Sequence, residues 1–213
     1  MDQLHVHQRP PASGPPQGLL ILHHGRGADE RDLSALADYF DPGRRLLAVM
    51  PRAPLTLPGS PGYHWYRVPR VGYPDPDSFW GALHQLAALH DRLWQITGLG
   101  PERTVLGGFS MGSVMSYALG LGPGRPVPAG ILAFSGFIPT VEGWRPDLGS
   151  RSGMPVFISH GRSDPVIGIG FAHQARQVLA AAELSVEYHE YAGGHQIEPE
   201  AARMARAWLS GVL

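Results

Sequence analysis

The sequence predicts an α/β fold with a mostly parallel central sheet and helices on both faces. Short apolar runs, such as residues 19–22 and 130–134, alternate along the chain with longer segments of helical periodicity. A strand that reads as a continuous apolar run is buried on both faces, which is typical of parallel sheets. Glycine-bearing turns follow several of these runs, at the place where open α/β sheets bind ligands. Because the chain has 213 residues, 43% of them hydrophobic, we expect residues 1–213 to form one domain.

The first half of the chain contains three expected strands and two expected helices. Apolar runs predict strands at about residues 4–7, 19–22 and 45–50, and helical spacing of apolar residues predicts helices at 32–40 and 79–96. Residues 52–77 lie between them and are rich in proline and aromatic residues. Long irregular segments in compact domains are usually functional, so we expect residues 52–77 to form a small lid or pocket loop.

The second half repeats the alternation of strand and helix. We expect a strand at 104–106 that meets a sharp turn and a helix, and further strands at 130–134, 155–159 and 185–191. Residues 141–153 are expected to be a loop, and helices are expected at 170–182 and 199–209. The alternation supports a parallel sheet covered on both faces.

The composition excludes several kinds of chemistry. The 17 basic and 18 acidic residues nearly balance, so we expect no nucleic-acid partner. Every basic residue is arginine and the chain has no cysteine, which removes lysine Schiff bases, a Ser-Lys dyad, disulfides and thiolate metal sites. The start of the chain lacks the features of a signal peptide and no stretch has the length of a membrane span, so a cytoplasmic protein without stable membrane insertion is expected.

The stretch from Thr104 to Met115 carries the strongest functional signal. Its pentapeptide Gly108-Phe109-Ser110-Met111-Gly112 fits the nucleophile elbow G-x-S-x-G, in which a serine lies on a strained turn between a strand and a helix. The glycines are expected because the strand and the helix approach too closely for a Cβ. The pentapeptide alone is a weak signal in a chain with 28 glycines, but here a strand precedes it and a helix follows.

Two later turns supply an acid and a base for Ser110. Asp164 follows the strand at 155–159 and His195 follows the strand at 185–191, so both should lie with Ser110 at the carboxyl edge of the sheet. Histidine can accept the serine proton, and a carboxylate can orient the imidazole, which gives a Ser-His-Asp triad. The reserve acid is Asp147, and the reserve bases are His160 and His173.

Two backbone amides are expected to stabilise a tetrahedral intermediate. One is the N–H of Met111, directly after the nucleophile, and the other is the N–H of Arg26, in the turn after the strand at 19–22.

Four segments together resemble one known family. The runs L-H-H-G-R-G-A-D, G-F-S-M-G, H-G-R-S-D-P-V and G-G-H-Q-I are similar to motifs of the phospholipase/carboxylesterase family of α/β-hydrolases, which includes acyl-protein thioesterases. The resemblance covers about residues 19–213 and implies an esterase with Ser110 as nucleophile, Asp164 as acid, His195 as base and oxyanion amides at Arg26 and Met111. The residue after the nucleophile is often glutamine in that family, whereas here it is Met111. Asp29 is expected to hold the oxyanion turn in shape.

The resemblance also places Trp65 beside the substrate pocket, and the alternative is that Trp65 packs in the core. We expect a carboxylic-ester hydrolase that forms an acyl-enzyme and acts on uncharged esters of short to medium acyl chains, with no metal or cofactor. A thioesterase or lysophospholipase of the same family stays open, as does a ligand-binding protein on a hydrolase scaffold. Homodimers occur among similar proteins, so the small-molecule ester and a second copy of the chain are the partners considered.

Overall fold

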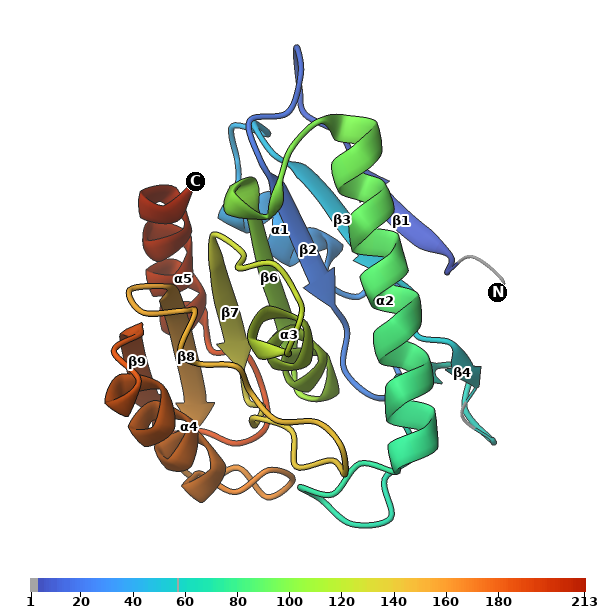
Figure 1. Ribbon diagram of the computed structural model, residues 1–213, viewed down its shortest axis with the longest axis vertical. Coiled ribbons are helices and arrows are strands. Elements are labelled where there is room, and N and C mark those ends of the chain that lie inside the picture. The colour runs from blue at the N-terminus through green and yellow to red at the C-terminus, as the bar shows by residue number, and fades with distance from the viewer. Residues whose placement is uncertain (1–3, 57) are drawn as a thin grey trace.

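A computed structural model describes residues 4–56 and 58–213 of the chain (Figure 1). Its centre is a seven-stranded sheet in the order β1-β3-β2-β6-β7-β8-β9. These strands are β1 (Val6–Arg9), β2 (Leu19–His23), β3 (Leu47–Pro51), β6 (Thr104–Phe109), β7 (Gly130–Phe134), β8 (Pro155–Gly161) and β9 (Ser185–Tyr191). All neighbouring pairs are parallel except β1 and β3, which are antiparallel at one edge. The predicted α/β-hydrolase class with a mostly parallel sheet is therefore confirmed.

The helices bury two separate cores against the two faces of the sheet. One core contains apolar side chains of α2 (Pro76–Thr97), α3 (Met111–Leu121) and α4 (Gly170–Ala181). The other contains side chains of α1 (Ser34–Phe40) and α5 (Pro199–Val212). Alternate residues of β2 belong to opposite cores, because successive side chains of a strand point to opposite faces. Burial on both faces explains why β2, β6 and β7 read as continuous apolar runs.

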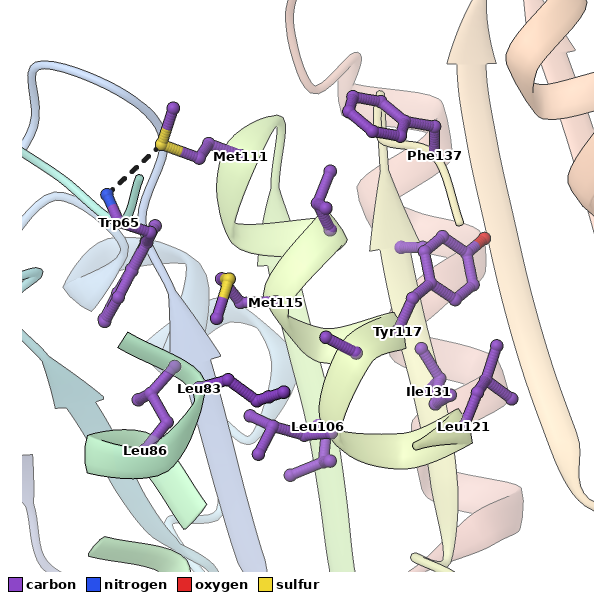
Figure 2. Close-up of a cluster of buried hydrophobic side chains, with 14 of the residues drawn as sticks. Trp65, Leu83, Leu86, Leu106, Met111, Met115, Tyr117, Leu121, Ile131 and Phe137 are labelled. Atoms are coloured by element: carbon purple, nitrogen blue, oxygen red, sulfur yellow. Dashed lines mark hydrogen bonds between the residues drawn. The ribbon is translucent and has the colours of Figure 1, made fainter. Parts of the chain in front are cut away.

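Side chains of distant segments meet in the larger core. Figure 2 shows Trp65, from the segment before α2, beside Met111 and Met115 of α3, with Leu86 of α2 nearby. This packing fixes the start of α3 relative to the segment before α2.

The region from 52 to 77 is more ordered than an irregular loop. It contains a short antiparallel pair, β4 (Leu55–Thr56) and β5 (Tyr63–His64), and it ends earlier than predicted because α2 begins at Pro76. Asp75 caps that helix by accepting a hydrogen bond from the Ser78 N–H at 3.0 Å. Position 57 of this predicted lid, like residues 1–3 of the predicted domain, lies outside the described residues.

The other expected elements are present with small shifts at their ends. β1 lies two residues later than the expected strand at 4–7, β8 extends to Gly161 and α5 extends to Val212. A short 3₁₀ helix, Pro101–Arg103, precedes β6. None of the described helices is both long enough and apolar enough to cross a membrane.

Candidate active site

Ser110 lies in a strained turn between β6 and α3. Its φ is 55° and its ψ is −120°, a conformation that non-glycine residues rarely adopt. Two glycines permit the turn: a Cβ on Gly108 would lie 2.4 Å from the Gly112 carbonyl carbon, and a Cβ on Gly112 would lie 1.9 Å from the His23 carbonyl oxygen. The Ser110 N–H donates to the Phe134 carbonyl at 2.8 Å, which ties the turn to the neighbouring strand β7.

The structure brings Ser110, His195 and Asp164 together in one hydrogen-bonded chain. The Ser110 Oγ lies 2.8 Å from His195 Nε2, and His195 Nδ1 lies 2.7 Å from the Asp164 Oδ2. An ionised carboxylate can only accept, so the Nδ1–H donates to Asp164 and Nε2 accepts the Ser110 hydroxyl proton. Ser110 and Asp164 are largely buried, and the three residues come from the carboxyl ends of β6, β8 and β9.

Asp164 is held in its ionised form by its surroundings. Burial disfavours the charge, but hydrogen bonds from His195 and from the Ile167 and Val166 amides outweigh it, so the pKa of Asp164 lies below its usual value. The two amides both donate to Oδ1, each at 2.8 Å, which leaves Oδ2 for the histidine. The carboxylate therefore has a fixed orientation.

The three reserve residues lie outside the hydrogen-bonded chain of Ser110, His195 and Asp164. His160 is buried, and its Nε2 donates to the Ile167 carbonyl at 2.7 Å, so it supports the turn that carries Asp164. Burial lowers the pKa of His160. His173 pairs with Glu190 on the surface, and Asp147 pairs with Arg151. None of the three contacts Ser110 within the described part of the chain.

Two backbone N–H groups beside Ser110 are available to a ligand. Met111 is the first residue of α3, and Arg26 follows β2 in the turn that runs beside β5. Among the described residues, neither N–H donates to a protein acceptor. The turn is held by the Gly27 N–H, which donates to the Tyr63 carbonyl at 2.8 Å, and by Asp29, which accepts from the Arg31 N–H at 2.8 Å. The Asp29 contact lies just after the turn, so the expectation that Asp29 holds the oxyanion turn in shape stays a prediction.

The resemblance implied a place for Trp65 beside the substrate pocket, whereas among the described residues it borders neither of the cavities at Ser110. It is fully buried, and its indole Nε1–H donates to the His24 carbonyl at 2.9 Å. Its backbone N–H donates to the Met111 Sδ at 3.2 Å, the dashed contact in Figure 2. The alternative of core packing is the observed one: Trp65 directly follows β5, Tyr66 is buried with it, and the segment becomes exposed only from Arg67 onward.

Ser110 lies between two cavities of different character. One, of about 120 Å³, is mainly apolar and also borders Met111. Its apolar wall is formed by Tyr66, Val68, Val71, Tyr73, Phe137 and Ile167. The other is a wider cleft of about 510 Å³ that borders His195 and the turn from Gly25 to Ala28. From the sequence, the wall of the apolar cavity was predicted only as part of the pocket loop at residues 52–77, and no sequence pattern indicated Phe137.

The described residues hold no cluster of three or more histidine, aspartate and glutamate side chains that could bind a metal ion. Two further histidines, His23 and His90, are also buried. His23 and His90 stack with ring centroids 5.7 Å apart, and His23 Nδ1 lies 2.9 Å from the Ser116 Oγ. Burial lowers the pKa of His23 to about 3, which keeps it neutral.

Comparisons with known proteins agree with this arrangement. Residues 10–213 match the model of the phospholipase/carboxylesterase family. The crystal structure of esterase PE8 is 32% identical, with a TM-score of 0.88 over 100% of both chains. Acyl-protein thioesterase 1 of Debaryomyces hansenii is 27% identical over 78% of this chain and 75% of its own. Esterase YpfH of Escherichia coli is 27% identical over 79% of this chain and 71% of its own. With a family match over almost its whole length, this chain belongs to the phospholipase/carboxylesterase family of α/β-hydrolases.

Proposed function

We propose that the protein is a serine carboxylesterase that hydrolyses esters of short to medium acyl chains through an acyl-enzyme. The observation that carries the proposal is the continuous hydrogen-bonded chain from Ser110 Oγ through His195 to Asp164, with distances of 2.8 and 2.7 Å. Membership of an esterase family supports the same reaction class.

The first half of the reaction forms the acyl-enzyme. His195 Nε2 takes the hydroxyl proton as the Ser110 Oγ bonds to the ester carbonyl carbon. The carbonyl oxygen becomes an oxyanion, which the N–H groups of Arg26 and Met111 stabilise. The start of α3 adds the positive end of its dipole at the same place. The intermediate then breaks the bond to the leaving oxygen, which receives the proton from His195, and acyl-Ser110 remains.

The second half releases the acid. A water molecule gives a proton to His195 and its oxygen bonds to the acyl carbon. The bond to the Ser110 Oγ then breaks, and the serine recovers its proton from His195. Asp164 stabilises the imidazolium in both halves and keeps its own charge, which its two backbone amide bonds favour.

The cavities suggest which part of the ester lies where. His195 must protonate the leaving oxygen, so the leaving group belongs in the cleft that borders His195. The acyl chain then occupies the apolar cavity of about 120 Å³, whose size favours short to medium chains.

The test is hydrolysis of 4-nitrophenyl esters from acetate to decanoate by the wild type and by Ser110→Ala. We expect the variant to lose at least about a thousandfold in kcat/KM, because the remaining site retains only oxyanion stabilisation and binding. The matched control is Ser113→Ala, whose hydroxyl is buried one turn along α3 and bonds to backbone carbonyls. Turnover that survives in Ser110→Ala contradicts the proposal.

Thioester hydrolysis is the second candidate, because several relatives are acyl-protein thioesterases. Matched ester and thioester substrates with the same acyl chain separate the two. A higher kcat/KM for the thioester would reverse the order proposed here.

A further inference from the structure

A third cavity adjoins the apolar cavity, and its wall includes two arginines. It has a volume of about 430 Å³, and its wall includes Arg26, His64 and Arg67. Arg26 and Val68 border this cavity and the apolar cavity beside Ser110, so the two share a wall. We refer to the third one as the arginine cavity.

The positive charge of the arginine cavity is only partly balanced by protein carboxylates. Among the described residues, the Arg26 guanidinium forms no ion pair. The nearby Glu30 is engaged by Arg52 through two hydrogen bonds of 2.6 and 2.7 Å. Arg67 has Asp75 at 3.6 Å, but 68% of its side chain is exposed, so this contact is weak.

His64 adds a buried imidazole to the arginine cavity. It is 7% exposed, and its Nδ1 is buried without a hydrogen-bond partner in the described part of the chain. Nε2 is therefore the ring nitrogen that can face the cavity. Burial lowers the pKa of His64, and the charges of Arg26 and Arg67 lower it further. Both arginines border the same cavity as the His64 ring. The imidazole is thus neutral and can donate one N–H.

The position of His195 indicates that the arginine cavity lies on the acyl side of the ester. The leaving group must lie on the side of His195, which borders the wide cleft and not the arginine cavity. Arg26 borders all three cavities, but Val68 borders only the arginine cavity and the apolar cavity, which takes the acyl chain. A substituent on the acyl chain can therefore reach Arg26, Arg67 and His64.

We propose that these three side chains bind an anionic group carried by the acyl chain, so that monoesters of dicarboxylic acids are preferred substrates. A carboxylate matches the two-donor face of a guanidinium and forms shorter, stronger hydrogen bonds than a neutral acceptor. The methylene groups between the carboxylate and the ester pass along the apolar wall at Val68. This inference rests on the proposed function, and it departs from the uncharged esters that the apolar loops alone favour.

The experiment compares two acyl esters that differ only in charge and one methyl group, 4-nitrophenyl hydrogen adipate and 4-nitrophenyl methyl adipate. In the wild type we expect kcat/KM to be about tenfold higher for the anionic ester, after subtraction of spontaneous hydrolysis, an advantage of the size that one or two partly exposed ion pairs provide. In the double variant R26Q/R67Q the ratio of the two kcat/KM values should fall to about 1. Raising NaCl to about 1 M, where the Debye length is about 3 Å, should reduce the wild-type ratio in the same direction.

Arg92→Gln is the matched control, because it removes one positive charge from an exposed position on α2 that borders none of these cavities. Its ratio should equal that of the wild type. A third arm moves the anion to the leaving group, with 3-(hexanoyloxy)benzoate against phenyl hexanoate, and should show no advantage for the anion.

Three results would overturn the inference: a wild-type ratio of about 1, a ratio that R26Q/R67Q leaves unchanged, or an advantage that appears only with the anionic leaving group. These results can be told apart from the result expected if the protein is not a serine esterase at all. In that case the wild type would hydrolyse neither the anionic nor the neutral acyl ester, and Ser110 would not react with a fluorophosphonate.

Discussion

Trp65 connects the two backbone segments that carry the proposed oxyanion amides, those of Arg26 and Met111. Its indole N–H holds the His24 carbonyl, two residues before Arg26, and its own backbone N–H holds the Met111 side chain. Among the described residues, Trp65 forms no hydrogen bond with Ser110 or His195, so we expect it to act on catalysis by positioning the two segments. A small displacement of oxyanion donors is costly, because their alignment supplies much of the rate.

We expect Trp65→Phe to lower kcat by about tenfold to a hundredfold and to change KM little. Phenylalanine retains most of the packing but loses the hydrogen bond to His24, so the free energy of unfolding should fall by about 1 kcal/mol. Steady-state kinetics on a 4-nitrophenyl ester and urea unfolding of the same preparations measure the two effects.

Trp144→Phe is the control for this prediction. Trp144 is also buried, and its indole N–H donates to the Ala118 carbonyl at 3.3 Å, far along α3 from the elbow. Its replacement should lower stability by a similar amount and leave kcat near the wild-type value. An equal loss of kcat in both variants would mean that Trp65 acts through general stability alone.

At the scale of elements, the start of α2 shapes the loop over the apolar cavity. Asp75 caps the helix, and Ser78 accepts a hydrogen bond from the Arg67 N–H at 3.0 Å. The Asp75 N–H donates to the Arg67 carbonyl at 3.0 Å, which closes the segment between them. That closed segment carries Val68, Val71 and Tyr73 of the cavity wall.

Asp75→Ala should therefore destabilise the protein by about 1 kcal/mol, the usual cost of losing a helix N-cap. Asp77→Ala removes the same charge from the first turn of α2 without removing the cap, and should cost less. The midpoints of urea unfolding compare the two variants. Equal midpoints would show that only the charge near the helix dipole matters.

Elements with a strong local signal were predicted well from the sequence. Strands β7 and β9 have the predicted bounds: β7 is a continuous apolar run after Pro128, and β9 alternates up to the turn at Gly193. The start of α2 was predicted three residues late, since the prediction followed the apolar spacing from Phe79 and disregarded the cap at Asp75 and Pro76.

Within the site, sequence order identified the three residues that form the hydrogen-bonded chain, because each follows the carboxyl end of a strand. The cavity walls were not predictable in the same way. Phe137 comes to line the same cavity as Val71 and Tyr73 only after segments distant in the sequence fold together, and no local pattern encodes that arrangement. The inward orientation of Trp65 depends in the same way on the packing of β5 against the turn at Gly27.

At the scale of the whole molecule, buried histidines couple folding to pH. Burial lowers the pKa of His23 to about 3, and it lowers the pKa of His90 well below the usual value. His23 of β2 and His90 of α2 stack ring on ring. The Nε2 atoms of both are buried without hydrogen-bond partners among the described residues. Neither ring can be protonated in the folded protein without a large cost in desolvation.

The free energy of unfolding should therefore fall as the pH decreases from about 6.5 towards 4.5. The unfolded chain binds protons at these histidines below a pKa of about 6.5, whereas the folded chain does not, so each contributes a slope of up to about 1.4 kcal/mol per pH unit. Above that pH both states are neutral and the full stability is present. The carboxylates with lowered pKa values, such as Asp164 and Glu30, add their own loss only at still lower pH.

Urea unfolding at closely spaced pH values measures this slope. His90→Phe should reduce the slope between pH 6.5 and 4.5 by about one proton, because it removes one imidazole that must stay neutral in the folded state. His84→Phe is the matched control, since His84 is exposed on the same helix α2, and it removes no buried imidazole. If His90→Phe and His84→Phe change the slope equally, the acid sensitivity of the fold does not come from the buried pair of His23 and His90.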